Sequence, residues 1–500
     1  MYRSRHNEDL DRRALNFLSS VDIDDKILYY DILCTKAHVI MLYEIRILTK
    51  EELASIVNEL DRVLRHPEKL VKEGFEDIHE ALETHLIRKI GVDVGGKVQS
   101  GRSRNDQVIT DIRIKARDDL IDILFHLINL VRLLIQKAEE NLNSIMPLYT
   151  HLQEAQLGNF AHYLLSYCSA LLRDVSRLIS LYDRVNESPL GSGPIGGSTL
   201  PLNRRRTAEL LGFKKIISNT IDATSSRDFM IEFMSDLTSI MITQSRIAQD
   251  IIIWSSQEFS FVEISDKHAS SSSAMPQKKN PDPLELTRSK TAIVIGNLTS
   301  IMTILKSLPS GYTRDLQDTK IPFWNSIDIT KSSLEIMKDI IDSLKIRKDE
   351  MAKASNSSYA ISIDIAEALV MKERLPFRTA HLLVGSLVNK AFKKKSSLKS
   401  LDIGEIKEIL QKLKISIAPD KLIRIIKETD SQRSLSIRRS PGSPNPKEQI
   451  KSLREYRMLL RKYFNLLQKR KHELESTIEN LTKTINHIIK SKSKSRPKYM

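Results

Sequence analysis

The residues best suited to acid–base chemistry lie in a polar segment at 270–281, which reads SSSSAMPQKKNP. An activated serine can exchange a proton, lysine can hold developing negative charge, and asparagine can donate hydrogen bonds to that charge. Serine and proline are unfavourable inside helices, so the segment predicts a loop. Mobile polar loops on a rigid frame commonly carry catalytic groups, although composition alone favours an ordinary surface loop.

Three further segments gather polar side chains without an evident packing role. GRSRNDQ (101–107) precedes a long apolar pattern and offers two guanidinium groups at a predicted helix N-terminus, with Asn105 or Asp106 as the expected cap. THLQ (150–153) places a histidine near an expected helix start, where it could transfer a proton at neutral pH. YTRDLQDTK (312–320) suits a polar, charged ligand. Taken singly, each segment could equally be a cap, a structural histidine or a surface turn.

Other catalytic signatures are missing from the sequence. It contains neither common glycine-rich phosphate-binding motif, no zinc-ligand spacing and no nucleophile elbow. The two cysteines, Cys34 and Cys168, cannot build a disulfide framework and fit a reducing compartment. These features disfavour nicotinamide, phosphoryl-transfer and zinc-dependent chemistry.

The elements that must position these motifs are predicted to be long helices. Neither glycine nor proline occurs in four long stretches, at 102–146, 213–275, 323–375 and 447–496. Strands alternating with helices would need glycine or proline at more of the connecting turns than these stretches contain. In the first stretch, apolar residues alternate by four and three positions, as in the seam of packed helices: Leu120, Leu124, Leu127, Val131, Leu134 and Ala138. We therefore predict an all-α fold, with a central bundle of long helices flanked by two smaller helical domains.

A chain of 500 residues exceeds one simple core, and we predict three regions. These are an N-terminal helical domain (1–100), the central bundle with the polar loop (101–350) and a C-terminal helical domain with a basic tail (351–500). A last helix is expected at about 447–490. Its apolar residues should pack on a neighbour, with another subunit as one candidate.

The net charge of +15 is concentrated toward the C-terminus, ending in the basic run Lys490, Lys492, Lys494, Arg496 and Lys498. A solvated basic tail is the simplest interpretation, and nucleic-acid binding would be an accessory property at most, because no base-reading motif accompanies it. The chain opens without a signal-peptide pattern, and its most apolar run is short and interrupted by charges. We expect a cytoplasmic protein without a membrane partner.

Taken together and in order, the motifs resemble those of the fumarase/aspartase superfamily, whose signature loop reads roughly GSSxMPxKxNP. Within it, GRSRNDQV (101–108), THLQ (150–153), QKKNPD (277–282) and RDLQ (314–317) are similar to the argininosuccinate lyase family, over roughly residues 15–450. The resemblance implies reversible β-elimination of L-argininosuccinate to L-arginine and fumarate in arginine biosynthesis, with no metal and no organic cofactor. It also implies a homotetramer whose active sites combine segments of three subunits.

The resemblance also implies a role for each matched residue. Ser272 would be the catalytic base, and Lys278 would hold the charge of the resulting aci-carboxylate. His151 would act near the leaving nitrogen, with Glu285 orienting it. The substrate-binding positions would be Ser20, Asp24, Ser103, Arg104, Asn105, Thr150, Asn280, Tyr312, Gln317 and Lys320.

Some positions depart from the family pattern, and other functions compete with the leading one. Ser271 stands where the family usually has glycine, which should stiffen the loop. Adenylosuccinate lyase shares the signature loop but would need a nucleotide-phosphate pocket. A catalytically silent relative, like the lens crystallins of this family, is a further alternative, against which the retained Ser272, Lys278, Asn280 and His151 argue.

Overall fold

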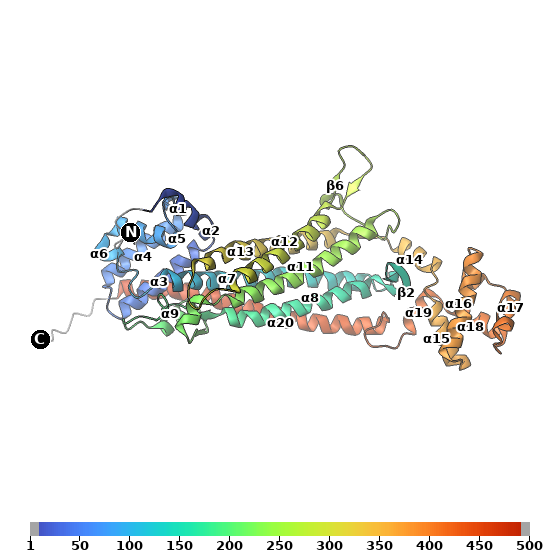
Figure 1. The fold of residues 1–500 in the computed structure, drawn as a ribbon. Coiled ribbons are helices and arrows are strands. Elements are labelled where there is room, and N and C mark those ends of the chain that lie inside the picture. Colours follow the sequence, from blue (N-terminus) through green and yellow to red (C-terminus); the bar gives the residue numbers. More distant parts are fainter. Residues whose placement is uncertain (1–9, 492–500) are drawn as a thin grey trace.

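The computed structural model describes residues 10–491 and shows an elongated molecule built along a bundle of long helices (Figure 1). Short helices cover one end of this bundle, and a small helical unit lies at the other. The long helices are α7 (Arg104–Glu140), α8 (Phe160–Val185), α11 (Asp228–Ser255), α12 (Asp282–Leu305), α13 (Lys320–Ser343) and α20 (Pro446–Lys490). The structure confirms the all-α prediction.

Helix α7 begins at the GRSRNDQ motif. Its N-cap is Ser103, whose side chain accepts a hydrogen bond from the N–H of Asn105, while the Asp106 carboxylate accepts one from the N–H of Ser103. The prediction of Asn105 or Asp106 as the cap was therefore wrong, because Ser103 is the last residue with extended backbone and Asp106 completes a capping box from inside the helix. The predicted apolar seam from Leu120 to Ala138 is buried.

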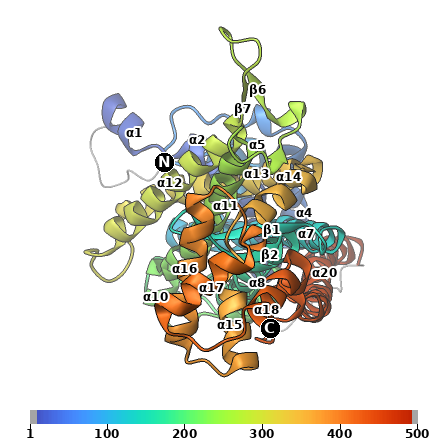
Figure 2. The same ribbon diagram turned by 90° about the vertical axis from the view of Figure 1, so that its right-hand side faces the viewer.

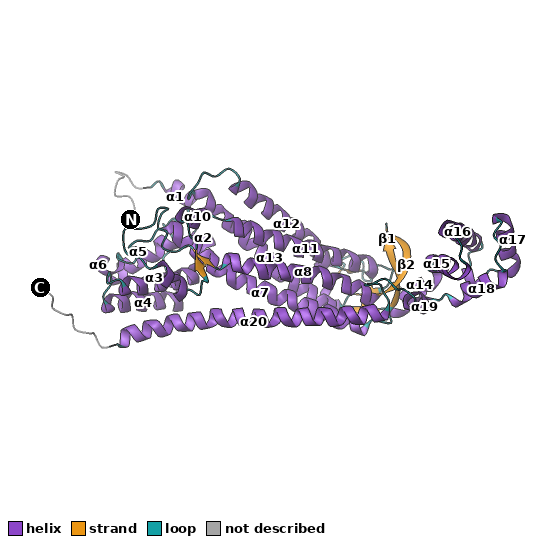
Figure 3. Cartoon of the chain, turned by 90° about the horizontal axis from the view of Figure 1, so that it is seen from below, coloured by secondary structure: helices purple, strands orange, loops and turns teal. Residues whose placement is uncertain are grey.

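The last helix, α20, runs back along the bundle against α7 and α8 of the same chain (Figure 3). Leu460 and Leu467 are buried in the bundle core, and the Phe464 ring meets the Phe125 ring edge to face at 6.2 Å. This chain itself thus covers the apolar stripe of the last helix. The basic residues beyond Ser491 lie outside the described residues, namely Lys492, Lys494, Arg496 and Lys498.

Two smaller groups of helices flank the bundle. The N-terminal group comprises α1 (Arg12–Leu18), α2 (Val21–Asp24), α3 (Leu28–Glu44), α4 (Lys50–Arg65), η1 (Pro67–Lys69), α5 (Ile78–Ile90) and α6 (Val92–Gly95). The C-terminal group comprises α15 (Ser362–Glu373), α16 (Phe377–Lys393), η4 (Leu398–Ser400), α17 (Ile403–Leu413) and α18 (Pro419–Glu428). This second group has a separate hydrophobic core between residues 365 and 426, whereas α20 belongs to the bundle.

Short elements connect the long helices and carry three of the motifs. The connecting helices are α9 (Arg204–Leu210), α10 (Thr220–Ser225), η2 (Asp266–His268), η3 (Arg314–Thr319), α14 (Lys348–Ser357) and α19 (Ser431–Ser436). The paired strands are β1 (Ile145–Thr150) with β2 (Gln153–Asn159), β3 (Glu187–Ser188) with β4 (Lys215–Ile216), β5 (Val262–Glu263) with β8 (Lys345–Ile346), and β6 (Ser270–Ser271) with β7 (Lys279–Asn280).

The THLQ motif forms the turn between β1 and β2, and the serine-rich segment forms the hairpin β6–β7, which projects above the bundle (Figure 2). The prediction of a helix start at THLQ was wrong, because Thr150 pairs with Gln153 across a two-residue turn. Among residues 10–491, no helix combines the length and apolar character needed to cross a membrane. Cys34 and Cys168 are both free and buried.

Candidate active site

The hairpin β6–β7 brings three predicted residues to one face. Ser270 pairs with Asn280, and the N–H of Ser272 donates to the carbonyl of Lys278 at 3.4 Å. Opposed residues of an antiparallel pair point to the same side, and alternate residues share a face. Ser272, Lys278 and Asn280 therefore lie on the same side of the hairpin. Ser271, in the position usual for glycine, has no positive φ, so serine fits there without backbone strain.

The Ser272 hydroxyl is held by the tip of the hairpin. Its Oγ accepts hydrogen bonds from the N–H of Met275 at 3.1 Å and from that of Ala274 at 3.3 Å. Donors aimed at this oxygen stabilise the alkoxide relative to the hydroxyl, which is what a serine base requires. The residues on either side, 271 and 273–279, are exposed. A surface that covered the hairpin would exclude water and strengthen these interactions.

A second group of predicted residues lies where α2 meets α13. The Lys320 ammonium forms an ion pair with Asp24 and donates to Ser20 Oγ at 3.2 Å, and Ser20 Oγ donates to the Asp24 carboxylate at 2.7 Å. All three residues are buried. Gln317 Nε2 donates to the carbonyl of Leu18 at 3.0 Å. The structure thus joins residues 20–24 with residues 317–320.

Two carboxylates hold two guanidinium groups beside this cluster. Arg104 Nη1 lies 2.7 Å from an Asp77 oxygen, and Arg314 Nη1 lies 2.9 Å from a Glu76 oxygen. Burial raises the pKa of the nearby Tyr312 phenol, against the attraction of the surrounding guanidinium groups. Nothing in the sequence indicates that Glu76 belongs here, because its role depends on a contact with Arg314, 238 positions away.

The start of α7 borders the same region. Asn105 Nδ2 donates to the carbonyl of Pro194 at 3.0 Å. The Asp106 carboxylate accepts hydrogen bonds from the N–H groups of Gly191 at 2.8 Å and Gly193 at 2.9 Å. Burial raises the pKa of Asp106 to about 6, against these hydrogen bonds. The glycine-rich connection is thereby held against Ser103 and Asn105.

His151 and Thr150 occupy a third place, at the turn between β1 and β2. His151 and Leu152 have φ values of 55° and 57° and are exposed. Side chains are disfavoured at positive φ, where hairpin turns prefer Asn-Gly, and such strain collects at functional sites. Glu285 is exposed in the first turn of α12, and within residues 10–491 no hydrogen bond or ion pair joins it to His151.

The predicted residues therefore stay in separate places within one chain. The 37 residues of α7 separate Ser103 from the THLQ turn by about 55 Å at 1.5 Å per residue. The 24 residues of α12 separate the hairpin from η3 by about 36 Å. In Figure 1, the hairpin and α2 correspondingly lie far apart along the bundle.

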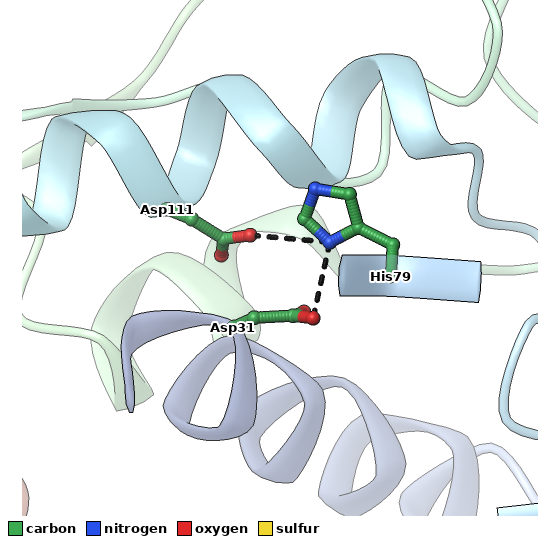
Figure 4. A group of neighbouring side chains, drawn as sticks. All are labelled: Asp31, His79 and Asp111. Atoms are coloured by element: carbon green, nitrogen blue, oxygen red, sulfur yellow. Dashed lines mark hydrogen bonds and ion pairs between the residues drawn. The ribbon is translucent and has the colours of Figure 1, made fainter. Parts of the chain in front are cut away.

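A buried ion cluster joins three helices close to the second group (Figure 4). His79 Nδ1 on α5 lies 3.0 Å from an Asp31 oxygen on α3 and 3.8 Å from an Asp111 oxygen on α7. These are residue types that can bind metals, and their donor atoms lie within 4.8 Å of one another. Here, His79 and Arg102 supply the positive charge that acts on both carboxyl groups.

The protonation of this cluster follows from its geometry. Burial opposes the charge of His79, but the attraction of Asp31, Asp77 and Asp111 raises the pKa of the imidazole to about 9. Burial likewise disfavours the Asp31 carboxylate, yet His79 lowers its pKa below the usual value. Burial and the repulsion of Asp31 raise the pKa of Asp111. His79 is therefore an imidazolium at neutral pH.

We expect His79 to stabilise the fold at neutral pH and to lose this effect as the pH becomes alkaline. A pKa raised above the unfolded value of about 6.5 stabilises the fold below pH 6.5, and this contribution, on the order of a few kcal/mol, is lost as pH rises through about 9. Urea unfolding at one protein concentration should show the wild-type chain more stable than His79→Asn at pH 6.5, with the gap narrowing by pH 9.5. A gap that stayed constant with pH would contradict the assignment.

The fold and the arrangement of these groups define a lyase of the fumarase/aspartase superfamily. The structure aligns with EDDS lyase in complex with formate at a TM-score of 0.87 and 28% identity, covering 97% of this chain and 96% of that one. It also has the fold of the class II fumarase from Schistosoma mansoni, with a TM-score of 0.70, 16% identity, and coverage of 85% and 95%.

Comparison with related sequences shows which family of this superfamily the chain matches. The family described as Lyase matches residues 15–296, and the family described as Argininosuccinate lyase C-terminal matches residues 359–430. The chain is 45% identical over 455 residues to the argininosuccinate lyase of Nitrosopumilus maritimus (strain SCM1), covering 91% of this chain and 93% of that protein. It is 38% identical over 457 residues to that of Methanocaldococcus jannaschii, with the same coverage. The chain belongs to the argininosuccinate lyase family.

Proposed function

We propose that this chain catalyses the reversible β-elimination of L-argininosuccinate to L-arginine and fumarate, acting in the cytoplasm as a homotetramer. The observation that carries the proposal is the division of the matched residues along the bundle, where the groups at the starts of α7 and α13 lie far from the THLQ turn and from the hairpin, respectively. The hairpin group suits proton abstraction, the group at α2 and α13 suits a charged ligand, and the THLQ turn presents a histidine. Symmetric association of identical chains can bring such groups together.

Exposed apolar side chains on α12 support association. Leu286, Ile293, Ile295 and Met302 are 56%, 46%, 41% and 42% exposed. Apolar side chains clustered on one exposed helix commonly mark an interface. Because α12 connects the hairpin to η3, a subunit packed against this helix would lie between the separated groups of its neighbour.

In the proposed reaction, Ser272 removes the proton beside a substrate carboxylate. The N–H groups of Ala274 and Met275 stabilise its alkoxide, and Lys278 and Asn280 hold the doubly negative aci-carboxylate. Closure of the hairpin over the substrate would exclude water and strengthen each of these interactions.

The remaining groups would hold the substrate and assist departure of the guanidinium nitrogen. His151 supplies a proton at that nitrogen, directly or through water, with Glu285 orienting it. Ser103, Asn105 and Thr150 bind the succinyl part. The arginine part is bound by Ser20, Asp24, Tyr312, Gln317 and Lys320, with Arg104 positioning charge.

Direct assay of purified protein tests the proposal. Fumarate release, followed by its ultraviolet absorbance, should occur with argininosuccinate and be at least about 100-fold slower with adenylosuccinate, because a site built to hydrogen-bond one substrate leaves buried groups unpaired with the other. A preference for adenylosuccinate would overturn the substrate assignment. Turnover of neither compound would indicate a catalytically silent relative.

A further inference from the structure

His79 connects the start of α5 to the start of α7 through Asp31. One oxygen of the Asp31 carboxylate accepts from His79, and the other accepts from Gln107 in the first turns of α7. Arg102 donates to Thr35 at 2.9 Å, beside Asp31 on α3. The imidazole therefore anchors the first turn of α5 to two other helices, at a point where every partner is buried.

The same turn of α5 carries the carboxylates that border the arginine-side group. Asp77 caps α5 by accepting from the N–H of Glu80 at 2.8 Å with one oxygen, and accepts from Arg104 with the other. The carbonyl of Glu76 accepts from the N–H of Ser20 at 2.9 Å, and its carboxylate accepts from Arg314. A shift of this turn would thus move two guanidinium groups and Ser20 together.

We propose that His79 is a positioning residue, whose contacts with Asp31 and Asp111 fix the first turn of α5 so that Glu76 and Asp77 hold the arginine side of the substrate pocket. The inference rests on the proposed function. If His79 carried no charge, Asp31 and Asp111 would lose the cation that lies between them, and burial and mutual repulsion would disfavour their ionised forms, with Arg102 as the remaining cation beside them. Their repulsion would displace α5 from α3 and α7, and the loop that precedes α5 would move with it.

His79→Asn tests this directly, because its amide nitrogen can keep the hydrogen bond of Nδ1 to Asp31 while losing the charge. In the synthetic direction, the KM for arginine should rise about tenfold or more, as expected when a binding group is displaced, while the KM for fumarate stays within about twofold. A role in general stability would lower the amount of active enzyme without raising the KM for arginine relative to the KM for fumarate. Unchanged KM values, or equal rises in both, would overturn the proposal.

Removing one carboxylate should restore the balance of charge. In the double variant His79→Asn with Asp111→Asn, the Asp31 carboxylate faces Arg102 without a second carboxylate beside it. The KM for arginine should therefore return to within about threefold of wild type. Such a rescue would show that the two neighbouring positions are energetically coupled. This variant also keeps the proposal testable if His79→Asn alone fails to fold. A KM for arginine no better than that of the single variant would contradict the charge argument.

His85→Asn is the matched control. His85 lies on the same helix, and its Nε2 is 2.9 Å from a Glu59 oxygen on α4, away from residues 76 and 77. We expect His85→Asn to change the stability of the protein without raising the KM for arginine relative to the KM for fumarate.

Amide hydrogen exchange of the substrate-free protein separates this proposal from the proposed function. His79→Asn should speed exchange at the N–H groups of Ser20 and Glu80 by about tenfold, and His85→Asn should not. If the wild-type chain released no fumarate, the proposed function would fail while exchange still decided whether His79 holds the turn. Unchanged exchange at both amides would overturn the positioning role.

Discussion

Replacing Ser272 by alanine should lower the turnover of argininosuccinate by on the order of 10³-fold, because general-base catalysis contributes about this much. The substitution should lower kcat and leave KM nearly unchanged, since the groups that bind the arginine part lie elsewhere in the fold. The change deletes only a hydroxyl on an exposed hairpin, so the assembly and its thermal unfolding should stay unchanged. Initial rates of fumarate release, with sedimentation and circular dichroism, measure both.

Ser273→Ala provides the matched control. Ser273 is the adjacent exposed serine, and alternation along the strand direction turns it to the other side of the hairpin. Its loss should change turnover by no more than about threefold, as expected for a surface change that touches no reacting group. If Ser272→Ala kept full turnover, the base would have to be another residue.

Two inactive variants should restore activity when their chains assemble together. Ser272→Ala disables the hairpin, and Lys320→Gln disables the group at α2 and α13. If a site takes these groups from different subunits, random assembly of equal amounts leaves about one quarter of the sites with both intact. Co-expressed chains should therefore recover about a quarter of wild-type activity, although each variant alone is nearly inactive. Rates per mole of purified mixed oligomer give the measurement.

The control for this experiment uses two changes in one hairpin. Ser272→Ala and Lys278→Met disable residues that face each other across β6–β7, so no mixed site can contain an intact hairpin. Their co-expression should leave the oligomer inactive. Recovery in this control, or none in the first mixture, would contradict a site divided between subunits in this way.

Most of the secondary structure could be predicted from the sequence, because helix formation depends on local periodicity and on the absence of breaking residues. The seam from Leu120 to Ala138 is buried in α7, as expected from its spacing. Local prediction failed where several conformations compete over a few residues. THLQ forms a strained hairpin turn because β1 and β2 pair on either side of it, and that pairing depends on residues outside the motif.

The sequence by itself determined the residue types that do the chemistry and their order along the chain, and through them the family. Only the tertiary structure decided which of these residues meet. It joined Asp24 to Lys320 across 296 positions, and it set the hairpin about the length of α12 away from them. It also assembled Asp31, His79 and Asp111 from three helices whose spacing indicated no cluster. Such contacts depend on how whole helices pack, which local patterns do not encode.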